Sequence, residues 1–170
     1  MTAASARFRS LVALPSAELD ALMRRGTTPD PDALAGVQYR GANTAAWMAR
    51  LRMQQFVKGF EGQPDGRLLG YNRRVAQDGR WTAPGQRFGF FDVGEVDPAA
   101  GDNHYLQALL LNYGAGGNGR FDPAGAIRDY LVRVDAGSDD LLIGRAFLAI
   151  GPFRPSPSFF ILEPLPHGGA

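Results

Sequence analysis

The sequence predicts an all-β protein, an antiparallel barrel of about eight to ten strands that is closed or nearly closed. Strand-like runs recur from residue 36 onward, and glycine, proline and aspartate fill the segments between them, as in tight turns. A helical pattern separates only the first two runs, so the crossover helices that parallel strands require are missing. These observations favour antiparallel strands joined by short connections.

The first 35 residues are expected to hold one short helix and a connector. Residues 1–10 look like a loose lead-in. The helix begins near Ser16, a plausible N-cap, and ends at Gly26, with an apolar stripe formed by Leu19, Leu22 and Met23. The prolines in residues 27–32 predict a rigid connector, because each one fixes its own backbone and biases the residue before it toward extended geometry.

The barrel is expected over residues 36–164, and its first strand over residues 36–41. A second helix, capped by Asn43 or Thr44 and reaching about Gln54, follows this strand and carries Trp47 on its apolar side. We expect it to cover the barrel as a lid. The remaining strands are predicted at residues 56–60, 68–77, 87–97, 105–113, 130–135, 141–150 and 158–163.

Two details of the strands follow from the alternation of side chains. The apolar phase changes from Phe88 and Phe90 to Phe91 and Val93, which predicts a bulge or sharp bend near residues 89–91. In the hairpin of residues 129–150, a five-residue loop would pair Tyr130 with Ala146 and would turn Tyr130 toward the barrel interior.

Composition sets bounds on the class of protein. A chain of 170 residues with 45% hydrophobic residues fits one domain with a core, and residues 165–170 are expected to form a frayed tail. A net charge of +1 does not indicate nucleic-acid binding, and no apolar run reaches membrane-spanning length. We therefore expect a soluble, cytoplasmic protein that is not integral to a membrane. Oligomeric state stays open.

The order of elements resembles the calycin superfamily, which includes the lipocalin and fatty-acid-binding barrels. The helix between the first two strands is similar to the lid of the fatty-acid-binding branch. Gly36, Tyr39 and Gly41 resemble the Gly-x-Trp-x-Gly signature of the nitrobindin-like branch, although tyrosine replaces tryptophan and the spacing is one residue longer. The resemblance covers residues 36–164 as a pattern and implies a barrel that can hold a small ligand.

Three short motifs have plain structural explanations. Residues 114–119 match G-x-G-x-x-G, but a proline and a glycine follow where a nucleotide-binding helix must begin, so a surface loop is expected. His104 can in principle bind haem or transfer a proton, whereas a hydrogen bond to the neighbouring Asp102-Asn103 turn is the simpler interpretation. Residues 135–140 are acidic enough for calcium but lack the spacing of a calcium loop. We expect no metal and no cofactor.

The candidate ligand site combines aromatic side chains with arginine. Tyrosine hydroxyls and an arginine can hold the polar end of a ligand while apolar side chains cover its body. Tyr71 and Arg73 form the favoured polar pair because they share a strand face. Arg50, Arg52 and Lys58 form a basic cluster that is expected to face solvent, with steering of an acidic ligand or contact with a membrane surface as the alternatives. The predicted ligand-binding residues are Tyr39, Trp47, Tyr71, Arg73, Phe88, Phe90, His104 and Tyr130.

The favoured function is binding of a small hydrophobic molecule, with an acidic group on it as an open alternative. A second hypothesis is an isomerase or cyclase that uses Tyr39, Tyr71, Arg73 or His104 for proton transfer or charge stabilisation. A third is a non-catalytic interaction module with an exposed apolar patch.

Overall fold

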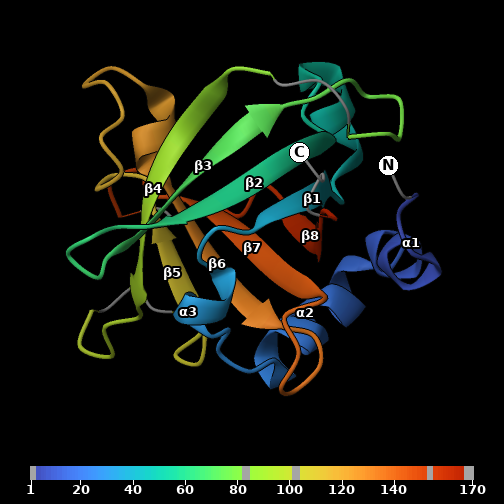
Figure 1. Ribbon diagram of the computed structural model, residues 1–170, viewed down its shortest axis with the longest axis horizontal. Coiled ribbons are helices and arrows are strands. Elements are labelled where there is room, and N and C mark those ends of the chain that lie inside the picture. Colours follow the sequence, from blue (N-terminus) through green and yellow to red (C-terminus); the bar gives the residue numbers. More distant parts are fainter. Residues whose placement is uncertain (1–2, 82–84, 101–103, 153–154, 167–170) are drawn as a thin grey trace.

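The protein is a closed barrel in which each strand pairs with the next and β8 pairs with β1, all antiparallel (Figure 1). The computed structural model describes residues 3–81, 85–100, 104–152 and 155–166. His167 and the Asp102-Asn103 turn lie outside these ranges. Within them the barrel strands are β1 (Gln38–Asn43), β2 (Gln55–Gly62), β3 (Leu68–Arg74), β4 (Arg87–Glu95), β5 (Leu109–Asn112), β6 (Ile127–Arg133), β7 (Leu142–Leu148) and β8 (Phe159–Pro164). The predicted all-β barrel is confirmed, and its shape is compatible with a calycin-like fold.

Five short helical segments accompany the strands in the described part of the chain: α1 (Ala6–Val12), α2 (Ser16–Arg25), α3 (Pro31–Leu34), η1 (Ala46–Leu51) and η2 (Pro123–Ala126). The helix predicted from Ser16 is α2. The loose lead-in is wrong, because Ser5 accepts a hydrogen bond from the Phe8 amide at 3.0 Å and starts α1. The lid segment η1 is shorter than predicted and is a 3-10 helix, since β1 continues to Asn43.

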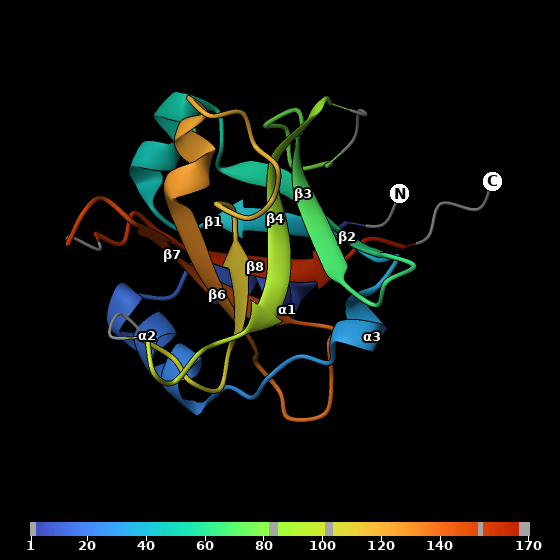
Figure 2. The ribbon, with the colours of Figure 1, turned by 90° about the vertical axis from the view of Figure 1, so that its left-hand side faces the viewer.

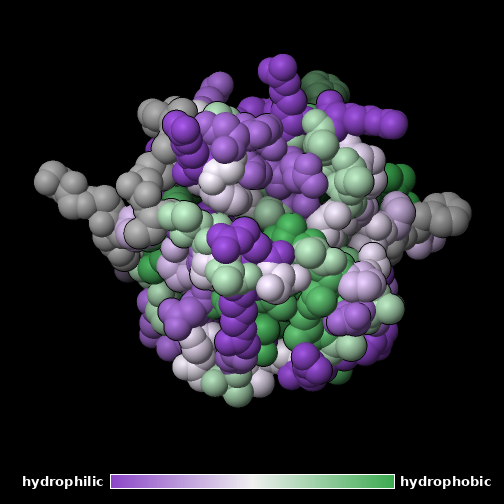
Figure 3. All heavy atoms as spheres, turned by 90° about the vertical axis from the view of Figure 1, so that its right-hand side faces the viewer, coloured by the Kyte–Doolittle hydropathy of each residue, from purple (hydrophilic) through white to green (hydrophobic). Residues whose placement is uncertain are grey.

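The N-terminal helices cover the outside of the barrel. α1 packs against β8 and α2 against β7. Phe8 and Leu19 enter an apolar layer that also contains Val132 and Ile143, the outward side chains of β6 and β7. On the face that carries α1, apolar residues gather below a mostly polar upper half (Figure 3). No helix in the described ranges is long and apolar enough to cross a membrane.

The two ends of the barrel differ. In Figures 1 and 2, η1 and η2 both lie at the upper end, and α3 lies at the lower end. Leu34 of α3 is fully buried and belongs to the same apolar cluster as Tyr39 and Phe60, which fill the lower half of the interior. The lower end is therefore closed by side chains.

The predicted bulge is confirmed. Gly70 pairs with Phe91 and Asn72 with Phe88, so β4 contains one extra residue opposite β3. Gly89 lies in this bulge with a φ of 54°, a conformation that glycine adopts more readily than other residues.

The predicted register of the β6–β7 hairpin is wrong by one residue. Asp129, not Tyr130, pairs with Ala146, and Val134 and Leu141 are joined by a backbone hydrogen bond across the turn. A shift of one residue turns every side chain of the strand to its other face. Tyr130 therefore lies outside the barrel, and Asp129 lies inside it.

Candidate functional site: a pocket with a buried lysine

A pocket of about 110 Å³ occupies the upper half of the barrel interior. Its wall is mainly apolar and includes half-buried side chains of η1, η2 and the nearby strand ends, among them Met48, Ala124, Ala146 and Leu148. Deeper in the pocket lie buried side chains, including Phe56 and Phe160. The pocket thus has an apolar approach and a well-defined interior.

Glycine makes room for the aromatic wall. A Cβ atom on Gly144 of β7 would overlap the ring of Phe160, the residue that pairs with Gly144 on β8. The same relation holds between Gly41 and the ring of Phe56. Without side chains at these two inward positions, both rings can lie against the barrel wall instead of filling the pocket.

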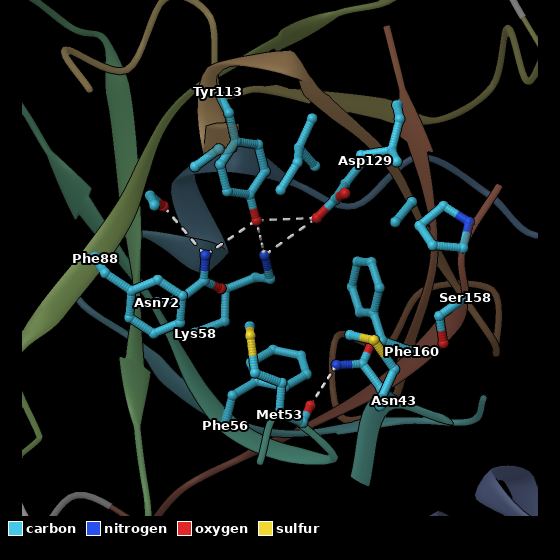
Figure 4. Close-up of a pocket in the computed structure, with 17 residues that line it drawn as sticks. Asn43, Met53, Phe56, Lys58, Asn72, Phe88, Tyr113, Asp129, Ser158 and Phe160 are labelled. Atoms are coloured by element: carbon cyan, nitrogen blue, oxygen red, sulfur yellow. Dashed lines mark hydrogen bonds and ion pairs between the residues drawn. The ribbon is translucent and has the colours of Figure 1, made fainter. Parts of the chain in front are cut away.

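Four polar side chains meet on one side of the pocket (Figure 4). The ammonium nitrogen of Lys58 lies 2.8 Å from the hydroxyl of Tyr113 and 3.3 Å from Oδ2 of Asp129. Tyr113 donates to the same Oδ2 at 3.0 Å, and Asn72 donates to the Tyr113 hydroxyl at 3.1 Å. The groups come from β2, β3, β6 and the residue after β5, so the closed barrel is what brings them together.

The bulge in β4 contributes to this arrangement. The carbonyl of Gly89 accepts a second hydrogen bond from the Asn72 amide at 3.1 Å. Both donor hydrogens of Asn72 are thereby engaged, which fixes the amide against Tyr113. Gly89 itself lines the pocket, so the bulge shapes the site and also holds one of its polar groups.

The Lys58 and Asp129 side chains are almost completely shielded from water, with exposed fractions of 1% and 5%. Burial lowers the pKa of the Lys58 amine and raises the pKa of the Asp129 carboxyl, while their mutual attraction opposes both shifts. Burial also raises the pKa of Tyr113 well above its ordinary value, so this hydroxyl keeps its proton. Both members of the pair are thus moved toward their neutral forms.

One polar atom in the site has no partner. Oδ1 of Asp129 is buried and makes no hydrogen bond with any residue that the structure describes, although a carboxylate oxygen normally accepts at least one. An unsatisfied buried oxygen costs about 1–3 kcal/mol, more when charged. In a residue that lines a pocket, this cost points to a role beyond folding.

The predicted site residues are largely dispersed. Of the eight, Phe88 lines the pocket. Tyr71 and Arg73 do share a face, but it is the outer face of β3, where Tyr71 accepts a hydrogen bond from Gln38 and lies under Arg87. Tyr39 is inside the barrel but in its filled lower half, against Phe60.

The other four predicted residues lie outside the pocket. Trp47 and Phe90 are 46% and 39% exposed. His104 is exposed and stacks on Phe147 with ring centroids 4.2 Å apart, and Tyr130 packs edge-on against the same ring at 5.6 Å. The segment η1 reaches the pocket through Met48 instead of Trp47.

The expected acidic turn and glycine loop have structural roles. Asp139 forms a two-pronged ion pair with Arg133, at 2.7 Å for each bond, and Asp135 pairs with Arg7. Asn118 of the glycine-rich loop binds the backbone of Phe90. Within the described ranges, no group of three or more His, Cys, Asp or Glu side chains is placed to hold a metal ion.

Searches of protein-family models, of curated proteins and of solved structures found no match to this chain. Function is therefore inferred from the pocket.

The sequence does contain an indication of the buried lysine. In Phe56-Val-Lys58-Gly-Phe60 the lysine shares its strand face with two phenylalanines, so inward-facing phenylalanines require an inward-facing lysine. The assignment of Lys58 to a solvent-facing basic cluster is wrong for this reason. Lys58 is also the only lysine among the 18 lysine and arginine residues of the chain.

Proposed function

We propose that the protein binds a small, mainly apolar molecule in the upper half of a calycin-like barrel, with a polar end of that molecule placed beside Lys58, Tyr113 and Asp129. The supporting observation is the combination of an apolar approach with a buried polar group that keeps one oxygen, Oδ1 of Asp129, unpartnered. Ligand sites typically combine an apolar lining with a few placed polar groups.

The size of the pocket limits the ligand. An engineered protein cavity of about 150 Å³ lined by apolar side chains holds benzene. The 110 Å³ found here, lined in part by Met48 of η1 and Ala124 of η2, fits one small ring or a short chain and leaves little room for anything larger. The preferred ligand class is therefore small molecules with one ring or a short chain and one oxygen-containing group.

Benzyl alcohol is a suitable first probe because it has one ring and one hydroxyl. We expect saturable binding with one site per chain, measured by isothermal titration calorimetry and by NMR shifts of the residues that line the pocket. Ala146→Phe places a ring in the pocket and should weaken binding roughly tenfold or more, a loss of about 1.4 kcal/mol. Ala17→Phe is the matched control, because Ala17 is exposed on α2.

The outcomes separate cleanly. Loss of affinity in Ala146→Phe but not in Ala17→Phe supports the pocket as the binding site. Equal affinity in the two variants, or shifts confined to residues outside the pocket, overturns the proposal. Circular dichroism of both variants verifies that each chain is folded when binding is measured.

A further inference from the structure

The residue type at position 58 is chemically distinctive within this chain. Of the 18 lysine and arginine residues of the chain, all but Lys58 are arginine, and Lys58 lines the pocket. A guanidinium stays protonated at any pH that a protein tolerates, whereas a lysine amine can lose its proton and become a nucleophile when it is buried. A positive charge alone would not require lysine here.

Burial favours the neutral form of the Lys58 amine, because the nitrogen is shielded from water. The rings of Phe91 and Phe160, with centroids 4.5 and 5.1 Å from the nitrogen, form part of this shield, although a ring face by itself attracts a cation. Oδ2 of Asp129 at 3.3 Å is close enough to accept the proton that the ammonium gives up. Tyr113 contacts both groups through one hydroxyl, so a proton can be passed among the three residues without water.

We propose that Lys58 anchors aldehyde or ketone ligands covalently, by forming an imine with their carbonyl carbon. This inference rests on the proposed function and names the ligand class of the same pocket. The unpartnered Oδ1 of Asp129 supplies an additional acceptor for the protons that this reaction moves.

The reaction balances with the groups present. The Lys58 ammonium transfers one proton to Asp129, and the neutral amine adds to the carbonyl carbon to give a carbinolamine. The carbinolamine oxygen gains protons from the nitrogen and from Asp129 and leaves as water, with formation of the carbon–nitrogen double bond. The product is a protonated imine beside an ionised Asp129, so the ion pair is restored and no oxidant or reductant is consumed.

A carboxylate ligand fits the site less well. Lys58 is already paired with Asp129, and a second carboxylate would face that buried carboxyl group across a short distance. Two buried carboxylates repel each other and resist ionisation together. A neutral carbonyl group avoids this repulsion, which distinguishes the proposed ligand class from the acidic ligands considered from the sequence.

Benzaldehyde tests the inference, since it differs from benzyl alcohol only in the oxygen-containing group. The folded protein is incubated with benzaldehyde and sodium cyanoborohydride, which reduces an imine to a stable benzylamine. Intact mass spectrometry and peptide mapping then locate the product. Because the chain has one lysine, the N-terminal amine is the only other primary amine and serves as an internal reference.

We expect one benzyl group on Lys58, formed at least about tenfold faster than on N-acetyl-lysine amide in the same tube at pH 7, since a free lysine amine with a pKa near 10.4 is almost fully protonated there. Excess benzyl alcohol should slow labelling of Lys58 but not of the N-terminus. Lys58→Arg keeps the charge and should show labelling at the N-terminus alone.

Labelling confined to the N-terminus, in a protein that still binds benzyl alcohol, overturns the imine and leaves the proposed binding function standing. Absence of both labelling at Lys58 and binding of benzyl alcohol rejects both proposals. Labelling of Lys58 at the rate of the free amine, unaffected by benzyl alcohol, also rejects the imine anchor, because it shows reaction without the pocket.

Discussion

The two halves of the barrel interior are built on the same strands but contain different kinds of side chain. Along β2 the inward residues are Phe60 in the lower half, Lys58 in the middle and Phe56 in the upper half. Along β6 they are Leu131, Asp129 and Ile127 in the same order. The backbone geometry is continuous, so the side chains alone decide which half is filled and which is hollow.

The lower half is packed like an ordinary protein core. Leu131, Leu142 and Leu162 are fully buried there, and Leu34 closes the end. In the upper half, the strands end with smaller or half-exposed residues such as Ala146 and Leu148. Lys58 and Asp129 lie at the boundary, where each could be shielded by the packed half and still contact the hollow half. The comparison teaches that a packed core and a pocket are divided between the two ends of one barrel.

The largest loss of stability at the boundary between the two halves is expected when Lys58 is left without its counter-ion. Asp129→Ala removes the carboxylate and leaves Lys58 buried without its counter-ion, which typically costs about 3–5 kcal/mol. We expect a loss of that size in the free energy of unfolding, measured by urea denaturation at pH 7. The double variant Lys58→Met/Asp129→Ala should recover most of it, because the uncompensated charge is gone. A loss below about 1 kcal/mol in the single variant would show that the pair contributes little in the folded state.

A matched pair of leucine truncations compares the two halves directly. Leu131→Ala opens a cavity in the packed half and should cost about 2–5 kcal/mol. Leu148→Ala removes a half-buried side chain beside existing space and should cost about 1 kcal/mol or less, because water or the pocket already borders it. Thermal or urea unfolding of the two variants measures the difference. Equal losses would mean that the upper half is packed as tightly as the lower half.

Much of the fold could be predicted from local sequence patterns. The number of strands follows from the alternation and from the turn residues between the runs, and the bulge at Gly89 follows from the change of apolar phase between Phe88 and Phe91. These features depend on residues that are close in the chain. Short-range patterns were therefore enough to predict the number of strands and the position of the bulge.

Local patterns could not predict which face of β6 points into the barrel, because both of its faces are buried. Leu131 points into the barrel, while Tyr130 and Val132 point out into the layer under the N-terminal helices. A strand that is apolar on both faces carries no alternation from which to choose a register. The helix α1, which forms part of the covering layer, was itself missed.

The site was missed for a related reason. Lys58 and Asp129 are 71 residues apart in the chain, and only closure of the barrel brings them together. The one local indication, a lysine between two inward phenylalanines, predicts burial of Lys58 but does not identify its partner. Tyr71 and Arg73 appeared to be the better polar pair because they are neighbours on one face, and that face turned out to be the outer one.

The smallest expected effect concerns the dependence of stability on pH. Burial lowers the pKa of Lys58 from 10.5, so over a range below 10.5 the unfolded chain holds a proton that the folded chain has lost. The free energy of unfolding that this group contributes rises with pH through that range and is lost as pH falls through the folded-state pKa. Asp129 acts at the acid end, because its pKa is raised from 3.8 and the stability due to its retained proton is lost as pH rises.

Comparing the wild type with the double variant Lys58→Met/Asp129→Leu isolates the contributions of Lys58 and Asp129 to the pH dependence of stability. Tyr113 remains in both chains, and its raised pKa keeps it neutral. Between about pH 7 and pH 9.5 the Lys58 contribution to the difference in unfolding free energy should change in favour of the wild type, because the unfolded chain keeps the lysine proton there while the folded chain loses it. Urea denaturation at several pH values measures the difference. A difference that stays constant would place the pKa of folded Lys58 at or above that of a free lysine, which would mean that Asp129 outweighs burial and holds the ammonium charged. The packed half and the hollow half would then be separated by a permanent ion pair, and the nucleophilic amine required for imine formation would be scarce at neutral pH.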